Sequence, residues 1–442
     1  MAVGRWIAIG LATAILSAVS PAFAAEQAAA PQTWAIHAQT TLVEQANAAF
    51  SAPYSGPNSL NPHAVGRETW DVTLYAGVRP WRGAEIWVNP EIDQGFGLSN
   101  TLGVAGFPSG EAYKVGKSAP YVRLQRLFIR QTLPIGGTEE AIDPDLNQLG
   151  GSQSADRLVI TAGKLSVGDV FDTNRYAHDP RHDFLNWSLI DAGTFDYAAD
   201  AWGYTYGVAA ELYLGRWALR AGSFDLSDVP NSTSLETDFS QYQLIGEVEE
   251  RHDLMGRPGK LKLTGFVSRG RMGRFDDAVR QAQTTGAPAD IAAVRAYRSR
   301  AGANFGVEQE VAEGIGVFLR GGLADGAIES YEFTDIDRTL SGGVSMDGGR
   351  WGRRGDTVAL GGVINGASRS RQSFLDAGGL GILIGDGKLP HPGAEDIVEA
   401  YYDFGLPRSA HISLDYQFID HPGYNRDRGP VSVFAVRLHG QF

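Results

Sequence analysis

Apolar and polar residues alternate along many short segments of this chain. Between Trp202 and Tyr213, one set of alternate positions carries large apolar or aromatic side chains, and the other set carries mainly Gly, Thr, Ala and Glu. Successive side chains of a β-strand point to opposite faces of a sheet, so this pattern predicts a strand with one apolar and one polar face. We expect Trp202, Tyr204 and Tyr206 on the apolar face.

The same alternation recurs about sixteen times, in segments of roughly 8–12 residues, the length that a tilted strand needs to cross a bilayer. Many apolar faces end in Trp or Tyr, as expected where strands meet lipid headgroups. The stretch 329–356 is ambiguous in its pattern. The predicted strands begin near Trp34, Thr69, Ala84, Val122, Arg157, Trp202, Trp217, Gln241, Lys260, Ser299, Ile315, Leu340, Thr357, Ile397, Ser409 and Val431.

These strands predict an all-β fold, namely a transmembrane antiparallel β-barrel of about 16 strands. A periplasmic β-sandwich is the alternative, because it would alternate too but would bury its apolar face in a core. A closed barrel leaves no unpaired strand edge in hydrocarbon, and the aromatic strand ends favour it. The last segment carries Phe434, Val436, Leu438 and Phe442 on one face. We interpret Phe442 as an assembly signal for the outer-membrane insertion machinery.

Predicted connections are short on one side of the barrel and long on the other, as in outer-membrane barrels. Tight turns are expected at 79–83 and 214–216. Residues 275–283 and 289–296 are expected to form short helices within one long loop. Long loops either fold inward as a constriction or cover the mouth. They are predicted at 89–120, 134–156, 166–201, 270–297 and 366–396.

Residues 1–24 are predicted to be a signal peptide, with Arg5, an apolar run and a small-residue exit at Ala22-Phe23-Ala24. A membrane anchor is the alternative, but the run is shorter than the about 20 residues of a span. Residues 25–442 then form a single barrel domain in the outer membrane of a Gram-negative bacterium, surrounded by lipid and lipopolysaccharide. The net charge of −13 gives no basis for binding nucleic acid. The absence of cysteine excludes disulfides and thiolate sites.

Motifs for catalysis are incomplete. Residues 110–118 resemble a phosphate-binding loop, but the glycine spacing is one residue too long. Neither a G-x-S-x-G nor an H-E-x-x-H motif occurs. His37 and His411 lie on predicted polar faces without a serine motif, so a barrel enzyme is a minor alternative and we expect no enzymatic activity.

Two loop segments carry metal-binding residue types. Residues 143–147 begin like a calcium loop, but Gln148 stands where that loop needs Gly. A loosely bound calcium is one interpretation, and a solvated acidic loop is the other. His178, Asp179, His182 and Asp183 combine imidazoles with carboxylates, which suits Mn²⁺, Zn²⁺ or Fe²⁺. The alternative is a loop held by internal hydrogen bonds. No other cofactor is expected.

Charged residues on the polar faces predict a water-filled lumen that carries both signs of charge. Phe128 and Tyr213 are expected to offer aromatic faces for stacking on sugars. For each single charge, a salt bridge that stiffens the wall is an equal alternative. The candidate pore-lining residues are Asp71, Arg79, Trp87, Arg126, Arg130, Arg220, Glu247, Glu249, Arg300, Glu308, Arg320 and Asp415.

Four stretches of the chain, at 53–60, 89–116, 163–207 and 378–402, resemble the carbohydrate-selective porin (OprB) family. The resemblance covers most of the chain after residue 24. It implies a barrel of sixteen antiparallel strands and passive uptake of sugars, with Arg, acidic and aromatic side chains at the constriction. The wider family also includes porins described as taking up manganese.

Together these observations predict a porin for passive diffusion of small polar solutes, above all glucose-like sugars, present as a monomer or trimer. Uptake of manganese or another divalent cation is the alternative, because an acidic entrance concentrates cations. A structural barrel with a plugged lumen is a further alternative.

Overall fold

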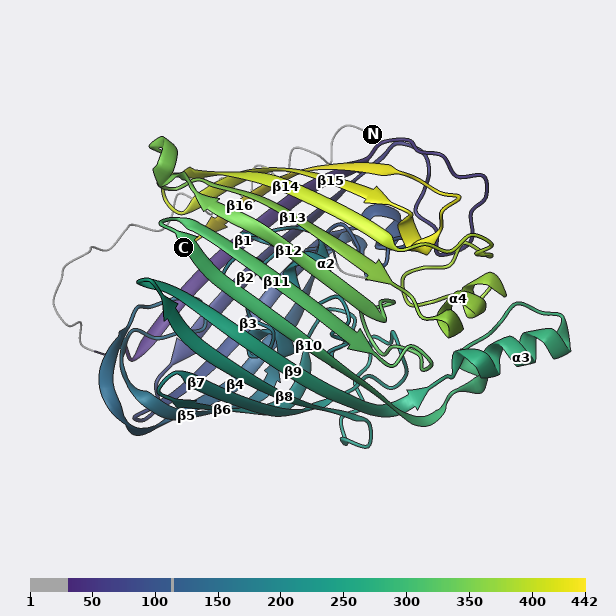
Figure 1. The fold of residues 1–442 in the computed structure, drawn as a ribbon. Coiled ribbons are helices and arrows are strands. Elements are labelled where there is room, and N and C mark those ends of the chain that lie inside the picture. Colours follow the sequence, from purple (N-terminus) through teal and green to yellow (C-terminus); the bar gives the residue numbers. More distant parts are fainter. Residues whose placement is uncertain (1–30, 113–114) are drawn as a thin grey trace.

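The computed structural model describes residues 31–112 and 115–442, so the predicted signal peptide lies outside the described residues. Sixteen antiparallel strands form a closed barrel in which each strand pairs with its neighbours in the chain and β1 pairs with β16 (Figure 1). The predicted fold class is confirmed, and each strand overlaps one predicted segment, although several begin a few residues before or after the predicted start. The strands are β1 Trp34–Asn47, β2 Val65–Val78, β3 Ala84–Gly95, β4 Lys117–Ile142, β5 Gly151–Leu165, β6 Thr205–Leu214, β7 Trp217–Asp225, β8 Tyr242–Leu254, β9 Arg257–Met272, β10 Ala296–Ala312, β11 Ile315–Ala324, β12 Arg338–Asp347, β13 Thr357–Gly366, β14 Glu395–Leu406, β15 Ala410–Asp420 and β16 Val431–Gln441.

Apolar side chains cover the outside of the barrel, as the alternation predicts. In β9, Leu263 is 61% exposed, whereas its neighbour Thr264 is 2% exposed and faces inward. Large aromatic side chains are exposed near both ends of the strands, which is where a membrane barrel meets the lipid headgroups. Near the short turns these are Trp34, Trp81, Trp217 and Trp351, and near the long loops they are Tyr206, Tyr297, Tyr416 and Phe418.

Long loops and short turns lie at opposite ends of the barrel. Figure 1 shows α3 and α4 among the long loops, at the end away from the chain end marked C. Among the described residues, no helix has the length and apolar character needed to cross a membrane. The helical segments are η1 Leu98–Asn100, η2 Val167–Asp169, α2 Trp187–Ile190, α3 Phe275–Thr285, η3 Ala292–Val294, η4 Gly348–Trp351, α4 Arg369–Asp376 and η5 Pro422–Tyr424.

Two predicted loop features are wrong. Residues 134–156 are largely strand, because β4 and β5 pair as far as Ile142 and Gly151 in a long hairpin. Pro134 and Gly136 mark irregularities of the ladder rather than its end. A helix was also predicted at 289–296, but only the short η3 forms there. A single turn is too short to sustain an α-helix by itself.

Trp202 and Tyr204 do not face lipid, contrary to the prediction. The strand β6 begins at Thr205, so both rings belong to the preceding loop, where they are 7% and 5% exposed. The Arg123 guanidinium lies 3.4 Å from the centre of the Trp202 ring. A cation–π contact with an inward-facing arginine therefore holds this ring inside the barrel.

Candidate solute passage inside the barrel

One long loop, residues 166–204, folds into the barrel, and we call it the inward segment. It connects β5 to β6 and contacts strands on the other side of the barrel. Its large apolar side chains are fully buried, including Phe171, Phe184 and Phe195. Glycines in the wall permit the close approach. A Cβ atom at Gly316 would lie 2.0 Å from the ring of Tyr176, so a larger residue there would displace the segment.

Wall charges from β14 and β16 hold the middle of the inward segment. The Arg437 guanidinium donates to the carbonyl oxygens of Pro180, His182 and Asp183, at 2.5, 3.1 and 2.8 Å. The Glu399 carboxylate accepts hydrogen bonds from the backbone N–H groups of Leu185 and Asn186, at 2.5 and 2.9 Å. Irregular backbone inside a barrel needs such partners, because a buried unpaired peptide group is costly.

Charges from β8, β10 and β11 hold the same segment. Arg320 of β11 donates to the carbonyl oxygens of Leu189 and Asp172, at 2.8 and 3.0 Å. Glu247 of β8 accepts from the backbone N–H of Asp172 at 2.9 Å. Arg300 of β10 pairs with Asp196 at 3.1 Å. The segment is therefore bonded to the wall at several strands, from β8 round to β16.

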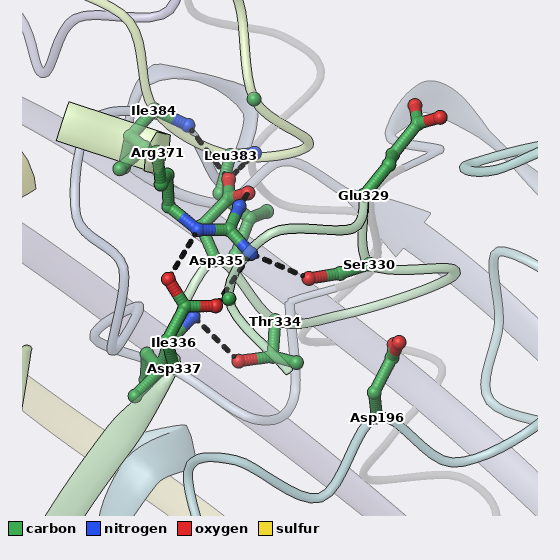
Figure 2. Close-up of polar contacts among 12 residues, drawn as sticks. Asp196, Glu329, Ser330, Thr334, Asp335, Ile336, Asp337, Arg371, Leu383 and Ile384 are labelled. Carbon is green, nitrogen blue, oxygen red and sulfur yellow. Dashed lines mark hydrogen bonds and ion pairs between the residues drawn. The ribbon is translucent and has the colours of Figure 1, made fainter. Parts of the chain in front are cut away.

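Two more long loops close around the inward segment. The Glu395 carboxylate accepts from the backbone N–H groups of Ala105 and Gly106 in loop 96–116, at 2.9 and 2.7 Å. Figure 2 shows the buried Arg371 of α4 between Asp335 and Asp337, which belong to loop 325–337. These contacts fix loop 96–116 to β14 and loop 325–337 to α4, while Asn186 and Asp196 of the inward segment bond to the two loops in turn.

A cavity of about 190 Å³ remains between the inward segment, Glu111 of loop 96–116 and Arg126 of β4. Arg126 makes a bidentate ion pair with Asp169, at 2.8 and 2.6 Å. The guanidinium also lies 4.9 Å from the centre of the Tyr204 ring. Both charge signs and several aromatic rings thus line one small space. The other lining residues include Ser166, His178, Asp179, Arg181, Trp187, Asp191, Tyr197 and Trp202.

A bulge in β4 turns Arg126 into the lumen. Asn89 pairs with Arg126, but the next residue, Pro90, pairs with Leu124, so the register shifts by one. Leu124 and Leu127 are both exposed on the outer face, while the two residues between them, Gln125 and Arg126, make their contacts inside. Proline has no N–H for the ladder, which favours a bulge at this position.

Carboxylates at the cavity have very different pKa values. Burial raises the pKa of Asp169, but the Arg126 guanidinium outweighs burial and leaves that pKa below its usual value. Asp179 behaves similarly, because Arg181 and His182 outweigh burial and lower its pKa to about 2. Asp191 is raised by burial and by nearby Asp172, to a pKa of about 7. The charge of the cavity therefore changes near neutral pH.

Of the twelve candidate pore-lining residues, Arg126 alone lines this cavity, whose lining lies within the described residues. Arg300, Arg320 and Glu247 hold the inward segment, and Glu308 does so as well by accepting from the Arg175 N–H at 3.0 Å. Trp87 is fully buried and covers Gly77. The others make ion pairs or hydrogen bonds within or near the wall: Asp71 with Arg181, Arg79 and Arg130 with Glu85, Arg220 with Glu247 and Glu249, and Asp415 with Gln417.

Sequence reasoning missed several cavity residues. Arg181 approaches Asp71, Glu91 and Glu111, at 3.7, 3.6 and 3.4 Å, and so joins the inward segment to β2, β3 and loop 96–116. Trp187 and Tyr197 also come from the inward segment. The available signal was the long stretch at 163–207 that resembles a porin family, since periodicity carries no information inside a loop.

The four candidate metal ligands at 178–183 do not converge on one point. Asp183 accepts from the backbone N–H groups of His178 and Asp179, at 2.9 and 3.1 Å, and Asp179 accepts from that of Arg181. These are the loop-stabilising bonds of the alternative interpretation. Within 31–112 and 115–442, the one group of three such residues with ligand atoms all within 4.8 Å of one another is Asp396, Asp420 and His421, at the loop end of β14 and β15.

The structure also shows the surroundings of the predicted calcium loop and of His411, one of the enzyme candidates. Gln148 donates to the carbonyl oxygen of Asp143, within a tight turn at the tip of the β4–β5 hairpin. His411 and Ser413 both bind the same carboxylate, that of Asp403, at 2.6 and 2.5 Å. A serine nucleophile would instead need its hydroxyl hydrogen-bonded to the imidazole.

Comparison with known proteins decides the family. The model of the carbohydrate-selective porin, OprB family, matches residues 58–442. The chain belongs to this family. It is accordingly an outer-membrane porin of a Gram-negative bacterium, and its solutes are carbohydrates. No curated protein matches the sequence.

One solved porin shares the fold of this porin, and two others are less similar to it. Pseudomonas putida OprB, in its high-pH structure, has 15% identity and a TM-score of 0.68, with 93% of this chain and 94% of that chain covered. Pseudomonas aeruginosa OccK2 (OpdF), in complex with glucuronate, has 9% identity and a TM-score of 0.46, covering 92% and 98%. Vibrio cholerae OmpT has 8% identity and a TM-score of 0.46, covering 93% and 100%.

Proposed function

We propose that this porin selects single sugar rings at the cavity formed by Arg126, Asp169 and Tyr204. The observation that carries the proposal is the charge pair beside an aromatic face. Arg126 and Asp169 form a bidentate pair, and the Tyr204 ring lies next to the guanidinium. A sugar has hydroxyl groups that bind such a pair and an apolar face that stacks on an aromatic ring.

The size of the cavity supports a small solute. Its volume of about 190 Å³ is many times the roughly 10–15 Å³ of such space that one water needs, so a small polar solute has room there. Trp187 and Trp202 add further aromatic surface to the lining. A passive channel must bind its solute weakly enough to release it, so one ring and one charge pair suffice.

The decisive experiment compares Tyr204→Ala and Arg126→Ala with the wild type in planar bilayers and in liposome swelling. We expect glucose to reduce the wild-type current. In both variants the affinity of glucose for the channel should fall about tenfold, equivalent to about 1.4 kcal/mol of binding free energy. Ion conductance should rise in Arg126→Ala, because a large side chain leaves the cavity.

Arg269→Ala is the matched control. Arg269 is exposed on the outer face of β9, so its removal should leave the glucose block unchanged. If both cavity variants keep the wild-type block, the sugar is selected elsewhere and the proposal is wrong.

We also propose that residues 1–24 are removed on export and that the barrel of residues 25–442 transports without catalysing a reaction. The charged start, apolar run and Ala22-Phe23-Ala24 exit support the cleavage. Mass spectrometry of the protein extracted from outer membranes should find Ala25 as the first residue. An intact N-terminus would contradict the cleavage.

A further inference from the structure

Three histidines lie together on the short-turn side of the inward segment. His411 and His439 are directly opposed in the register of β15 and β16, and His182 comes from the inward segment. The His182 ring centre lies 4.3 Å from that of His439 and 5.9 Å from that of His411. None of the three lines the Arg126 cavity. This histidine trio is therefore a separate feature of the lumen.

The ring separations of the trio are close to those around one metal ion. Imidazoles bind Zn²⁺ with metal–nitrogen distances of about 2.0–2.1 Å, so two rings on a tetrahedral ion have centres about 5 Å apart. The two observed separations lie on either side of this value. Directly opposed positions on neighbouring strands also keep His411 and His439 close without any help from the loop.

Hydrogen bonds orient the two wall histidines as metal ligands. The Nδ1 atom of His411 lies 2.6 Å from the Asp403 carboxylate, so Nδ1 carries the hydrogen and Nε2 keeps its lone pair. The Nδ1 atom of His439 lies 3.1 Å from Thr41 Oγ1. An imidazole whose second nitrogen is held by an oxygen partner is the usual arrangement around a bound metal ion.

The Nε2 atom of His439 points to a missing partner. His439 is 4% exposed, and its Nε2 is buried without a hydrogen-bond partner. A buried polar atom without a partner is costly and needs an explanation. Asp179 lies near both His182 and His439 and offsets part of the positive charge of Arg181 and Arg437. A metal ion that accepts the Nε2 lone pair would give this atom its partner.

We propose that His182, His411 and His439 bind a divalent transition-metal cation, and that the bound ion ties the inward segment to β15 and β16. Imidazole ligands favour Zn²⁺, Cu²⁺ and Ni²⁺ over Mg²⁺ and Ca²⁺, which prefer oxygen. The three ligand nitrogens do not all lie within 4.8 Å of one another, so binding draws them together. His411 is partly exposed at its side chain, 26%, and has room to rotate.

Zinc binding to the untagged porin in detergent tests the proposal by calorimetry, with Mg²⁺ as the comparison ion. We expect one Zn²⁺ per chain, no comparable Mg²⁺ signal, and loss of binding in His182→Ala and His439→Gln. Asp403→Asn should weaken binding by about tenfold, since it removes the negative charge of the partner that orients His411. In planar bilayers, Zn²⁺ should lower the wild-type conductance but not that of His182→Ala.

His63→Ala is the control, because His63 is exposed and lies on loop 48–64. It should bind Zn²⁺ like the wild type. Circular dichroism of each variant shows whether the barrel has formed, and His182 is a loop residue whose removal leaves every strand pair intact. The proposal is overturned if the wild type binds no Zn²⁺, or if folded His182→Ala and His439→Gln bind it with wild-type affinity.

Discussion

Two long loops extend from the same end of the barrel, but only one of them enters the lumen. The inward segment enters the lumen and is bonded to wall charges on both sides, including Arg437 and Arg320. Loop 273–295 instead carries α3, which packs against α4 through Phe275 and Phe374, with ring centres 5.0 Å apart. The outer face of α3 is polar, and the side chain of Arg280 is 70% exposed.

The difference shows what brings a loop inside a barrel. A loop can enter only if the lumen wall supplies partners for its irregular backbone, and buried charged side chains supply several bonds each. The inward segment finds such partners, whereas α3 satisfies its own backbone within the helix. Charge on the inner wall therefore serves folding as much as conduction.

The variant with the largest expected effect on this comparison is Arg437→Ala. It removes the donor to three buried carbonyl oxygens, so we expect the free energy of unfolding to fall by about 3 kcal/mol. The loosened segment should also widen the passage and raise single-channel conductance. Urea-dependent unfolding in detergent and bilayer recording measure the two effects. Unchanged stability and conductance would mean that the inward segment is held without its wall charges.

A smaller effect is expected from the charge inside the passage. Burial places the pKa of Asp191 at about 7, so this carboxyl is neutral below that pH and negative above it. Cation selectivity, measured as reversal potential in a salt gradient, should rise between pH 6 and pH 8. Asp191→Asn should remove this step. Asp143→Asn is the control, because Asp143 lies at an exposed turn at the short-turn end of the barrel, and this variant should keep the pH-dependent rise in selectivity. If the rise persists in Asp191→Asn, another group causes it.

The smallest effect is expected on the outward loop. Arg280→Ala breaks an exposed pair with Asp277 on α3 and should change the free energy of unfolding by less than about 0.5 kcal/mol. Conductance should not change. A loss as large as that of Arg437→Ala in the same urea experiment would show that exposed and buried arginines contribute alike.

The strand pattern could be predicted because each strand is governed by a local rule. Period-two alternation placed Leu263 outside and Thr264 inside, and the structure agrees. The rule failed at Trp202, where alternation continues past the start of β6 although the chain has already left the sheet.

The passage itself was less predictable. Arg126 and Arg320 share the same residue type and the same predicted face, yet one lines the cavity and the other holds Leu189. Their roles depend on the path of the inward segment, which no local pattern records. The contribution of Arg181 was hidden for the same reason, since its partners lie on three other elements.

The pairing of the first strand with the last has a consequence for biogenesis. Ala38 and Phe442 exchange both backbone hydrogen bonds, at 3.0 and 2.8 Å, where β1 meets β16. β1 is the first strand to be exported, so the row of peptide groups on the edge that will pair with β16 stays unpaired longest. An open sheet edge invites pairing with other chains, so β1 is a site of aggregation until β16 pairs with it.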